Sequence, residues 1–222
     1  MRYIKIHKEG RMILSSLLII LFALNSYIYI HFPLPALAVN LIISALLLFF
    51  FAYFFRNPPR KVYIEDPSLV IAPADGTVVV VEPTDELEYF GDKRIQVSIF
   101  MSVFNVHANW YPVKGRVLKS KHHGGRHMAA FLPKSSHENE RSTVVIETEF
   151  KTQILVRQIA GALARRIVTY AHAGKECHLN EHLGFIKFGS RVDIYFPLDA
   201  EIFVKVGEST RGNETIIARL NE

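Results

Sequence analysis

The chain has 222 residues, half of them hydrophobic, with a single cysteine and a formal net charge of +5. That length allows one ordinary domain plus an appendage, and a lone Cys177 excludes an internal disulfide, so we expect it to be an ordinary buried residue. Residues 1–61 carry seven basic side chains and one acidic side chain, and the rest of the chain is close to neutral. This distribution does not indicate a protein that binds nucleic acid through a basic surface, and we expect no nucleic-acid partner.

A short basic segment, residues 1–11, leads into a hydrophobic segment, residues 12–55, that contains no Asp, Glu, Lys or Arg. Within it, apolar runs of 19 and 20 residues are separated by HFPLP, and each run is long enough to cross a bilayer as a helix. Pro33 and Pro35 break the helix between the two runs. The pattern therefore predicts a helical membrane hairpin, either spanning the bilayer or re-entrant.

Basic residues flank this hairpin on both outer sides, while its connector contains no Lys or Arg. Because positive charge stays in the cytoplasm, both ends of the hairpin and the following domain are expected on the cytoplasmic face of the cell membrane. A cleaved signal peptide is not indicated, since the apolar region is too long and no small-x-small site follows it. Residues 56–69 form the expected linker, and residues 70–222 the expected domain.

From Val70 onward, short β-runs alternate with turn residues, as in VIAPADGTVVVVEP, RIQVSIFMS and TVVIETEF. The stretch QIAGALARRIVTYAHAG is read as a strand followed by a short helix, and polar loops are predicted at KSKHHGGRHMAAF and LPKSSHENERST. PADGTVVVVE and KVGESTRGNETIIARL both pair Gly turns with β-runs, as in folds whose chain ends meet. We therefore expect an α+β fold, mainly β with some helix, in which a barrel-sandwich-like β domain follows the helical hairpin.

Three short features are candidates for reactive groups. Asp75 precedes Gly76 in APADG, His107 lies in the apolar run SIFMSVFNVHANWYP, and Gly189 precedes Ser190 in FIKFGSRVDIYFP. Each also has an ordinary structural interpretation, namely a type I turn, a packed core histidine and a β-bulge. Taken together, an Asp, a His and a Ser preceded by Gly are suited to activating a hydroxyl that attacks its own upstream peptide.

Other histidines crowd the middle of the chain, at His122, His123, His127 and His137. No Cys or carboxylate completes a ligand set at metal-binding spacing, so we expect an exposed basic loop and no metal. Phosphate-loop, dinucleotide-binding, zinc-protease and GxSxG motifs are absent from the sequence.

Several segments occur in a specific order after the hydrophobic N-terminus: APADGTVV, SIFMSVFNVHANWYPVKG, HENERSTVVIET, RQIAGALARRIVTY and GFIKFGSRVDIYFP. In this combination the chain resembles, over nearly its whole length, the phosphatidylserine decarboxylases in their short, membrane-anchored bacterial form. No single segment would carry that resemblance.

The resemblance implies a proenzyme that cleaves itself between Gly189 and Ser190 and converts Ser190 into a pyruvoyl cofactor. A large chain, residues 1–189, and a small chain, residues 190–222, would then remain together as a heterodimer, with a higher oligomer left open. The pyruvoyl ketone condenses with the amine of a phosphatidylserine headgroup in the membrane and accepts the electrons released as CO2 leaves. The product would be phosphatidylethanolamine, in phospholipid biosynthesis.

By the same resemblance, His107 matches a histidine used in self-processing or proton transfer, and Asp75 matches the acidic residue that orients or activates it. Longer family members have a second histidine three residues later, where this chain has Trp110, so a division of roles between two histidines does not carry over.

Three arginines, Arg141, Arg165 and Arg166, are candidates to hold the lipid phosphate or the departing carboxylate, because Arg makes bidentate contacts with oxyanions. Structural ion pairs with Glu138 or Glu140 are the alternative.

Rival interpretations stay open on the sequence alone. One is a non-enzymatic, membrane-anchored carrier or binding module of the barrel-sandwich type, and another is an anchored scaffold in which the Gly-Ser pair is a bulge. Both would leave the chain uncleaved. A third keeps the chemistry but applies it to a different phosphoserine lipid.

Overall fold

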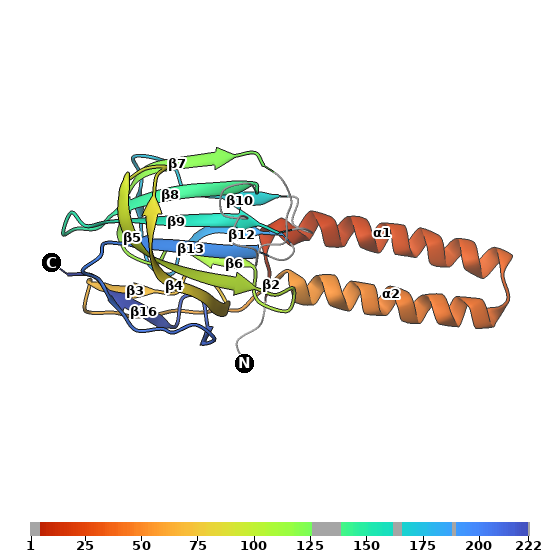
Figure 1. Ribbon diagram of the computed structural model, residues 1–222. Coiled ribbons are helices and arrows are strands. Elements are labelled where there is room, and N and C mark those ends of the chain that lie inside the picture. Colours follow the sequence, from red (N-terminus) through yellow and green to blue (C-terminus); the bar gives the residue numbers. More distant parts are fainter. Residues whose placement is uncertain (1–4, 126–138, 162–165, 188–189, 222) are drawn as a thin grey trace. The chain divides into compact units, whose positions relative to one another are not determined.

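The computed structural model describes residues 5–125, 139–161, 166–187 and 190–221. Its contacts divide the chain into two compact units, one ending at Pro59 and the other beginning at Arg60. The first unit contains two long helices, and the second contains fourteen strands among its described residues (Figure 1).

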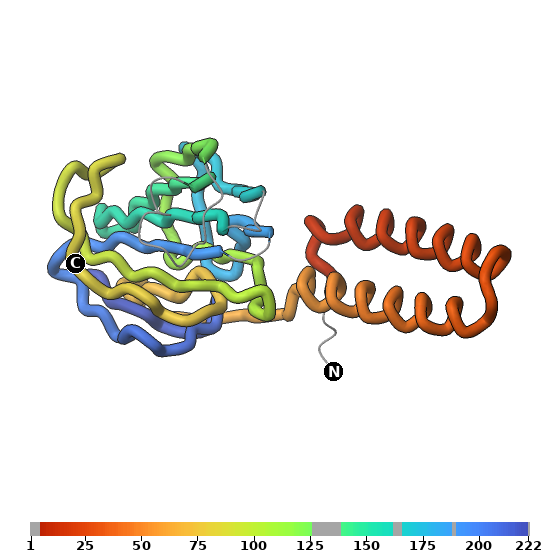
Figure 2. The backbone as a smooth tube through the Cα atoms, turned by 45° about the vertical axis from the view of Figure 1, so that its right-hand side comes forward, coloured from red at the N-terminus to blue at the C-terminus, as the bar shows by residue number. Residues whose placement is uncertain are grey.

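In the first unit, helix α1 (Lys8–His31) and helix α2 (Leu34–Phe54) lie side by side as a hairpin (Figures 1 and 2). Strands β1 (Lys5–Ile6) and β2 (Arg56–Asn57) pair with each other antiparallel. Both helices are long and apolar enough to cross a membrane. The first turn of α2 contains Pro35, a position where its missing N–H costs no helical hydrogen bond.

Polar contacts tie the two helices together within this apolar hairpin. The Asn25 side-chain amide donates to the Ser44 hydroxyl at 3.0 Å, and Asn40 donates to the Asn25 carbonyl oxygen at 2.9 Å. At the other end, Gly10 allows a close approach, because a Cβ there would lie 2.3 Å from the Phe55 ring. Interhelical amide bonds and small residues of this kind stabilise helix pairs that have only lipid around them.

The second unit contains three sheets whose neighbouring strands pair antiparallel. The largest has eight strands in the order β11-β7-β8-β9-β13-β5-β4-β15, and the smaller two have the orders β10-β12-β6 and β14-β16-β3. The bounds are β3 (Leu69–Ile71), β4 (Gly76–Glu86), β5 (Asp92–Met101), β6 (Ala108–Trp110), β7 (Gly115–His123), β8 (Arg141–Glu147), β9 (Gln153–Ala160), β10 (Ile167–Thr169), β11 (Glu176–Cys177), β12 (His182–Ile186), β13 (Ser190–Phe196), β14 (Glu201–Ile202), β15 (Ser209–Thr210) and β16 (Ile216–Arg219). The large sheet curls on itself (Figure 1), and the fold is mainly β with some helix, as the sequence predicted.

The two faces of the large sheet differ in chemistry, because successive side chains of a strand point to opposite sides. On β13, Val192, Ile194 and Phe196 are fully buried in the main apolar core. The residues between them point the other way, where Tyr195 belongs to a second, smaller cluster. We refer to these sides as the core face and the outer face of the sheet.

The first and last parts of this unit meet, as the repeated Gly-turn pattern predicted. Strand β16 pairs with β3, with Ala218 opposite Val70, and β15 pairs with β4, with Thr210 opposite Gly76 (Figure 2). The turn that the sequence placed between two β-runs at PADG separates β3 from β4. The small segment after Ser190 therefore shares sheets with the earliest strands of the unit.

Two local predictions are corrected by the structure. The short helix expected after β9 is wrong for its described part, because Ile167–Thr169 forms strand β10 against β12. The polar loop expected from Lys119 is also wrong at its start, since β7 continues to His123 and pairs with β8. In both places sheet pairing overrides weak local preference.

The Gly-Ser pair lies where the chain changes sheets. Strand β12 belongs to a three-stranded sheet, whereas β13 begins at Ser190 in the eight-stranded sheet. Gly189 itself lies outside the described residues. The two apolar runs on either side of the pair are thus separate strands.

Candidate active site

Ser190 is the first residue of β13 and is fully buried. It stands between Met101 of β5 and Ala160 of β9 in the antiparallel ladder. Its hydroxyl donates to the Met101 sulfur at 3.3 Å. Sulfur is a weak acceptor, so this contact fixes the hydroxyl without competing strongly for its proton.

His107 lies just before β6 and is also fully buried. Its Nε2 is 3.1 Å from the carbonyl oxygen of Ser102, which directly follows Met101 in the chain. The His107 carbonyl accepts the N–H of Ile186, the last residue of β12, at 3.2 Å. The structure therefore brings His107 and Ser190 to the same end of β5, where they contact consecutive residues.

Asp75 lies in the turn before β4, and its buried carboxylate has other partners. It forms a bidentate ion pair with Arg60 and accepts the N–H of Gly212 at 2.8 Å. His107 is not among the partners of Asp75 within the described residues. Asp75 thus links the start of this unit, at Arg60, to the segment after β15, at Gly212.

Trp110 packs beside this ion pair. The Arg60 guanidinium carbon lies 5.4 Å from the Trp110 ring centroid, and a Cβ on Gly212 would lie 2.7 Å from the ring. The Trp110 N–H donates to the Pro73 carbonyl at 2.9 Å, which fixes the turn that carries Asp75. Arg60 was missed in the sequence, where it looked like one of several basic residues in a linker.

Polar side chains continue along the core face from Ser190. Asn109 of β6 and Gln158 of β9 are fully buried, and Gln158 Nε2 donates to Asn109 Oδ1 at 2.7 Å. Asn109 Nδ2 in turn lies 3.6 Å from the Met101 sulfur. The sequence alone did not predict this series of polar contacts. Gln158 follows Ile154 and Val156 at every second position of an apolar run, and that pattern indicates a polar side chain on the core face.

The candidate arginines are not gathered around Ser190 by the described part of the structure. Arg141 stands opposite Ile159, which in turn stands opposite Arg191, so it lies on the outer face while Ser190 faces the core. Its guanidinium Nε is 3.5 Å from a Glu88 carboxylate oxygen. This placement favours a structural ion pair for Arg141.

The structure gives little information on the other two candidate arginines, Arg165 and Arg166. Arg166 is exposed, and its carbonyl accepts the N–H of Lys187 at 3.3 Å. Arg165 lies outside the described residues. Substrate binding by these two residues stays a prediction.

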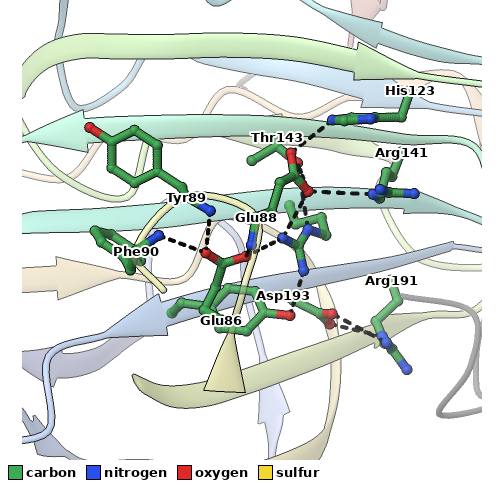
Figure 3. A network of polar contacts seen from close by, with 11 residues as sticks. Glu86, Glu88, Tyr89, Phe90, His123, Arg141, Thr143, Arg191 and Asp193 are labelled. Atoms are coloured by element: carbon green, nitrogen blue, oxygen red, sulfur yellow. Dashed lines mark hydrogen bonds and ion pairs between the residues drawn. The ribbon is translucent and has the colours of Figure 1, made fainter. Parts of the chain in front are cut away.

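A buried charged network covers the outer face behind Ser190 (Figure 3). Arg157 of β9 donates to Glu86 at 2.6 Å, to Glu88 at 3.0 Å and to the Tyr195 hydroxyl at 2.8 Å. Thr143 donates to Glu88 at 3.2 Å. These contacts fasten the turn after β4 onto β8, β9 and β13 and hold β13 from the side opposite the core.

The carboxylates of this network are held in their charged form. Burial alone would raise the pKa of Glu86, but the N–H groups of Phe90 and Tyr89 and the Arg157 guanidinium outweigh it, so the pKa lies below its ordinary value. Burial opposes the shift at Glu88 too, where Arg157 and a neighbouring histidine still lower the pKa. The network is therefore ionic at neutral pH.

The histidines predicted in a loop lie partly on a strand. His122 and His123, at the end of β7, contact Glu140 at 3.4 Å and Glu88 at 2.7 Å, respectively. His127 and His137 lie outside the described residues. Within the described ranges, no group of three or more His, Cys, Asp or Glu side chains is arranged to hold a metal ion.

Comparison with known proteins assigns the chain. The family model described as phosphatidylserine decarboxylase matches residues 47–218. A Bacteroides thetaiotaomicron protein named phosphatidylserine decarboxylase proenzyme is 52% identical, over 99% of this chain and 97% of that protein. The chain belongs to the phosphatidylserine decarboxylase family. Proteins with the same name from Bacteroides fragilis and Parabacteroides distasonis are 52% and 50% identical, over 99% and 98% of this chain and 97% and 100% of their own lengths.

Membership in the phosphatidylserine decarboxylase family confirms the resemblance drawn from the ordered segments. The matched region contains Asp75, His107 and Ser190, together with the polar chain through Asn109 and Gln158. The word proenzyme in the names of the relatives describes a precursor that is activated by processing.

Proposed function

We propose that this chain is a self-processing, pyruvoyl-dependent decarboxylase that converts phosphatidylserine to phosphatidylethanolamine and CO2. Family membership and the names of the relatives support the overall reaction. The single observation that carries the self-processing is the position of Ser190, buried at the junction between two sheets, with its hydroxyl held by a weak acceptor.

The proposed processing uses groups of the chain itself and one water molecule. The Ser190 hydroxyl attacks the Gly189 carbonyl, and the amide becomes an ester as the Ser190 nitrogen is released. Elimination then frees the Gly189 carboxylate and leaves a dehydroalanine, which water converts to a pyruvoyl group and ammonia. The products are residues 1–189 and residues 190–222.

The residues around Ser190 fit a pyruvoyl group at that position. Because Ser190 begins β13, cleavage on its N-terminal side leaves the whole strand in the ladder between β5 and β9. The small chain would also keep the pairings of β15 with β4 and of β16 with β3. These pairings support a stable association of the two chains as a heterodimer after cleavage.

When present, the pyruvoyl group supplies a ketone that condenses with amines and acts as an electron sink for decarboxylation. We assign His107 to proton transfer, because its ring is buried and fixed at the strand end that carries Ser190. Asp75 is proposed as a positioning residue. Its carboxylate holds Arg60 and Gly212, and thereby the turn at the start of β4, beside β5.

The helical hairpin suits a substrate that remains in a bilayer. Two apolar helices that precede the domain in the sequence are compatible with membrane association. The basic residues that flank the hairpin support a cytoplasmic location for the domain. An enzyme anchored in this way meets lipid headgroups at a high effective concentration.

Intact mass measurement of the purified full-length protein tests the proposal. We expect two chains, with the small chain lighter by one ammonia than the same peptide with an N-terminal serine. Ser190→Ala should give one uncleaved chain that releases no CO2 from phosphatidylserine. Ser98→Ala, which alters another fully buried serine on the adjacent strand, should still be cleaved. A cleaved or active Ser190→Ala protein would contradict the pyruvoyl proposal.

A further inference from the structure

The core face of the large sheet changes from apolar to polar toward Ser190. On β9, Ile154 and Val156 face the core and are followed at the same face by Gln158. On β8, Val144 faces the core and is preceded at the same face by Ser142. Gln158 and Ser142 are both fully buried, which is unusual for polar side chains unless each has partners or a function.

The orientation of the Gln158 amide follows from its neighbours. Its Nε2 donates to Asn109 Oδ1 at 2.7 Å, and Asn109 Nδ2 points to the Met101 sulfur at 3.6 Å. The Gln158 Nε2 also lies 2.7 Å from the place where a Cβ on Gly184 would be, so the glycine makes room for this amide. The Nε2 of Gln158 therefore already has a hydrogen-bond partner, and Oε1 is the atom of the amide that can still accept a hydrogen bond.

Two oxygens at this place have no hydrogen-bond partner in the described part of the chain. They are Gln158 Oε1 and Ser142 Oγ, and each is buried. Ser142 and Gln158 stand directly opposite each other in the pairing of β8 with β9. A buried oxygen without a partner costs about 1–3 kcal/mol, so two of them on facing residues require an explanation.

Their position relates them to the proposed reaction centre. Gln158 stands opposite Val192 on β13, two residues beyond Ser190 and on the same face. Two residues of a strand span roughly 7 Å, and the contacts of Gln158 with Asn109 and of Asn109 with Met101 lead back over this distance to the Ser190 hydroxyl. Gln158 Oε1 is a pure acceptor, and the Ser142 hydroxyl adds a second oxygen lone pair, so the facing pair is suited to a donor-rich group.

We propose that Gln158 and Ser142 bind the amine of the phospholipid headgroup and hold it next to residue 190. This inference rests on the proposed function and extends it to headgroup specificity. A protonated amine donates up to three hydrogen bonds and would satisfy both oxygens, whereas a carboxylate oxygen would repel Gln158 Oε1. The charged residues Arg157 and Arg191 lie on the opposite face of the sheet, so the site selects the amine through neutral acceptors.

Ser142→Ala is the sharpest test, because its hydroxyl makes no hydrogen bond to any described residue that the change would remove. Thr148→Val is the matched control. Thr148 directly follows the other end of β8, and its buried hydroxyl likewise has no hydrogen-bond partner among the described residues. Each purified, cleaved protein is titrated in detergent by calorimetry with short-chain phosphatidylethanolamine and with short-chain phosphatidylglycerol, which lacks an amine. The melting temperature and the cleaved fraction are measured alongside.

We expect Ser142→Ala to bind phosphatidylethanolamine about tenfold more weakly, with unchanged binding of phosphatidylglycerol and unchanged cleavage. Its melting temperature should be no lower than that of the wild type, because a buried oxygen without a partner is removed. Thr148→Val should match the wild type in lipid binding and cleavage, and its melting temperature should likewise be no lower. Gln158→Met, which removes the Oε1 acceptor, should produce a loss of the same kind. If Ser142→Ala binds both lipids as the wild type does, the two oxygens hold a structural water and the inference is wrong. Failure of the proposed function would appear separately, as an uncleaved wild-type chain.

Discussion

Met101 and Ser190 lie directly opposite each other in the pairing of β5 with β13, and the Ser190 hydroxyl is 3.3 Å from the Met101 sulfur. The next residue, Ser102, presents its carbonyl oxygen to the His107 ring. One strand end thus organises both the residue that we propose to be cleaved and the histidine beside it. A shift of β5 by a single residue would move both, because it would turn every side chain to the other face.

His107→Ala should slow self-cleavage by about two orders of magnitude, as expected when a positioned proton-transfer group is removed. The measurement is the fraction of cleaved chain over time, followed on a denaturing gel after synthesis of the protein. His178→Ala serves as the control, since that histidine is half-exposed and directly follows β11, the edge strand of the large sheet. Cleavage of His107→Ala at the wild-type rate would remove His107 from the processing step.

Asp75→Asn should lower stability and slow cleavage together. The change removes one of the two carboxylates, Asp75 and Glu214, that the buried Arg60 guanidinium contacts. Breaking a buried ion pair costs at most about 3–5 kcal/mol, and the remaining Glu214 contact lowers that cost. Arg60→Gln should reproduce both effects if Asp75 acts by holding the turn. Melting temperatures and cleavage rates of the two variants decide the point.

The control for the Asp75 experiment is Arg219→Gln, which breaks ion pairs whose Arg219 side chain is about half-exposed. Exposed pairs contribute little, so this variant should stay near the wild type. If Asp75→Asn abolishes cleavage while Arg60→Gln cleaves normally, Asp75 has a direct chemical role and the positioning role proposed here is wrong.

Acid should destabilise the domain through the network around Arg157. The pKa values of Glu86 and Glu88 are lowered from 4.5 in the folded state, so their contribution to stability is complete above about pH 4.5 and is lost as the pH falls through the folded values. Glu86→Gln should therefore lower the melting temperature at pH 7, and the gap from the wild type should narrow toward pH 3.

The matched control for the acid experiment is Asp85→Asn, which breaks an exposed pair with Lys93 one residue away from Glu86. It should shift the melting temperature little at any of these pH values. A gap between the wild type and Glu86→Gln that stays constant from pH 7 to pH 3 would contradict the assigned ionic state of Glu86.

Much of the fold was readable from local pattern. Alternating apolar residues predicted the strands on either side of Gly189-Ser190, and the matching Gly turns predicted that the first and last strands meet, as β3 and β16 do. Helix α1 begins at Lys8 rather than at the first apolar residue, because the His7 ring accepts the Glu9 N–H and caps it. Boundaries of this kind depend on side-chain contacts that periodicity does not encode.

The site was less readable, because its geometry depends on contacts between distant parts of the chain. Asp75 was paired in the sequence with His107, whereas its carboxylate contacts Arg60 and the N–H of Gly212. Arg141 was a candidate for lipid binding, but strand register places it on the face opposite Ser190. Register is fixed by long-range pairing, so no local motif could have assigned these partners.

Cys177 should be unreactive in the native protein. Burial raises the pKa of its thiol to about 12, and its Sγ lies 3.3 Å from the Gly115 carbonyl oxygen, so the reactive thiolate is scarce at pH 8. Iodoacetamide at that pH should leave the folded protein unlabelled and its decarboxylation of phosphatidylserine intact, while the protein unfolded in urea is labelled once. Intact mass measures both states, and rapid labelling of the native protein would show that the thiol is accessible and argue against the packing of β11 on β7.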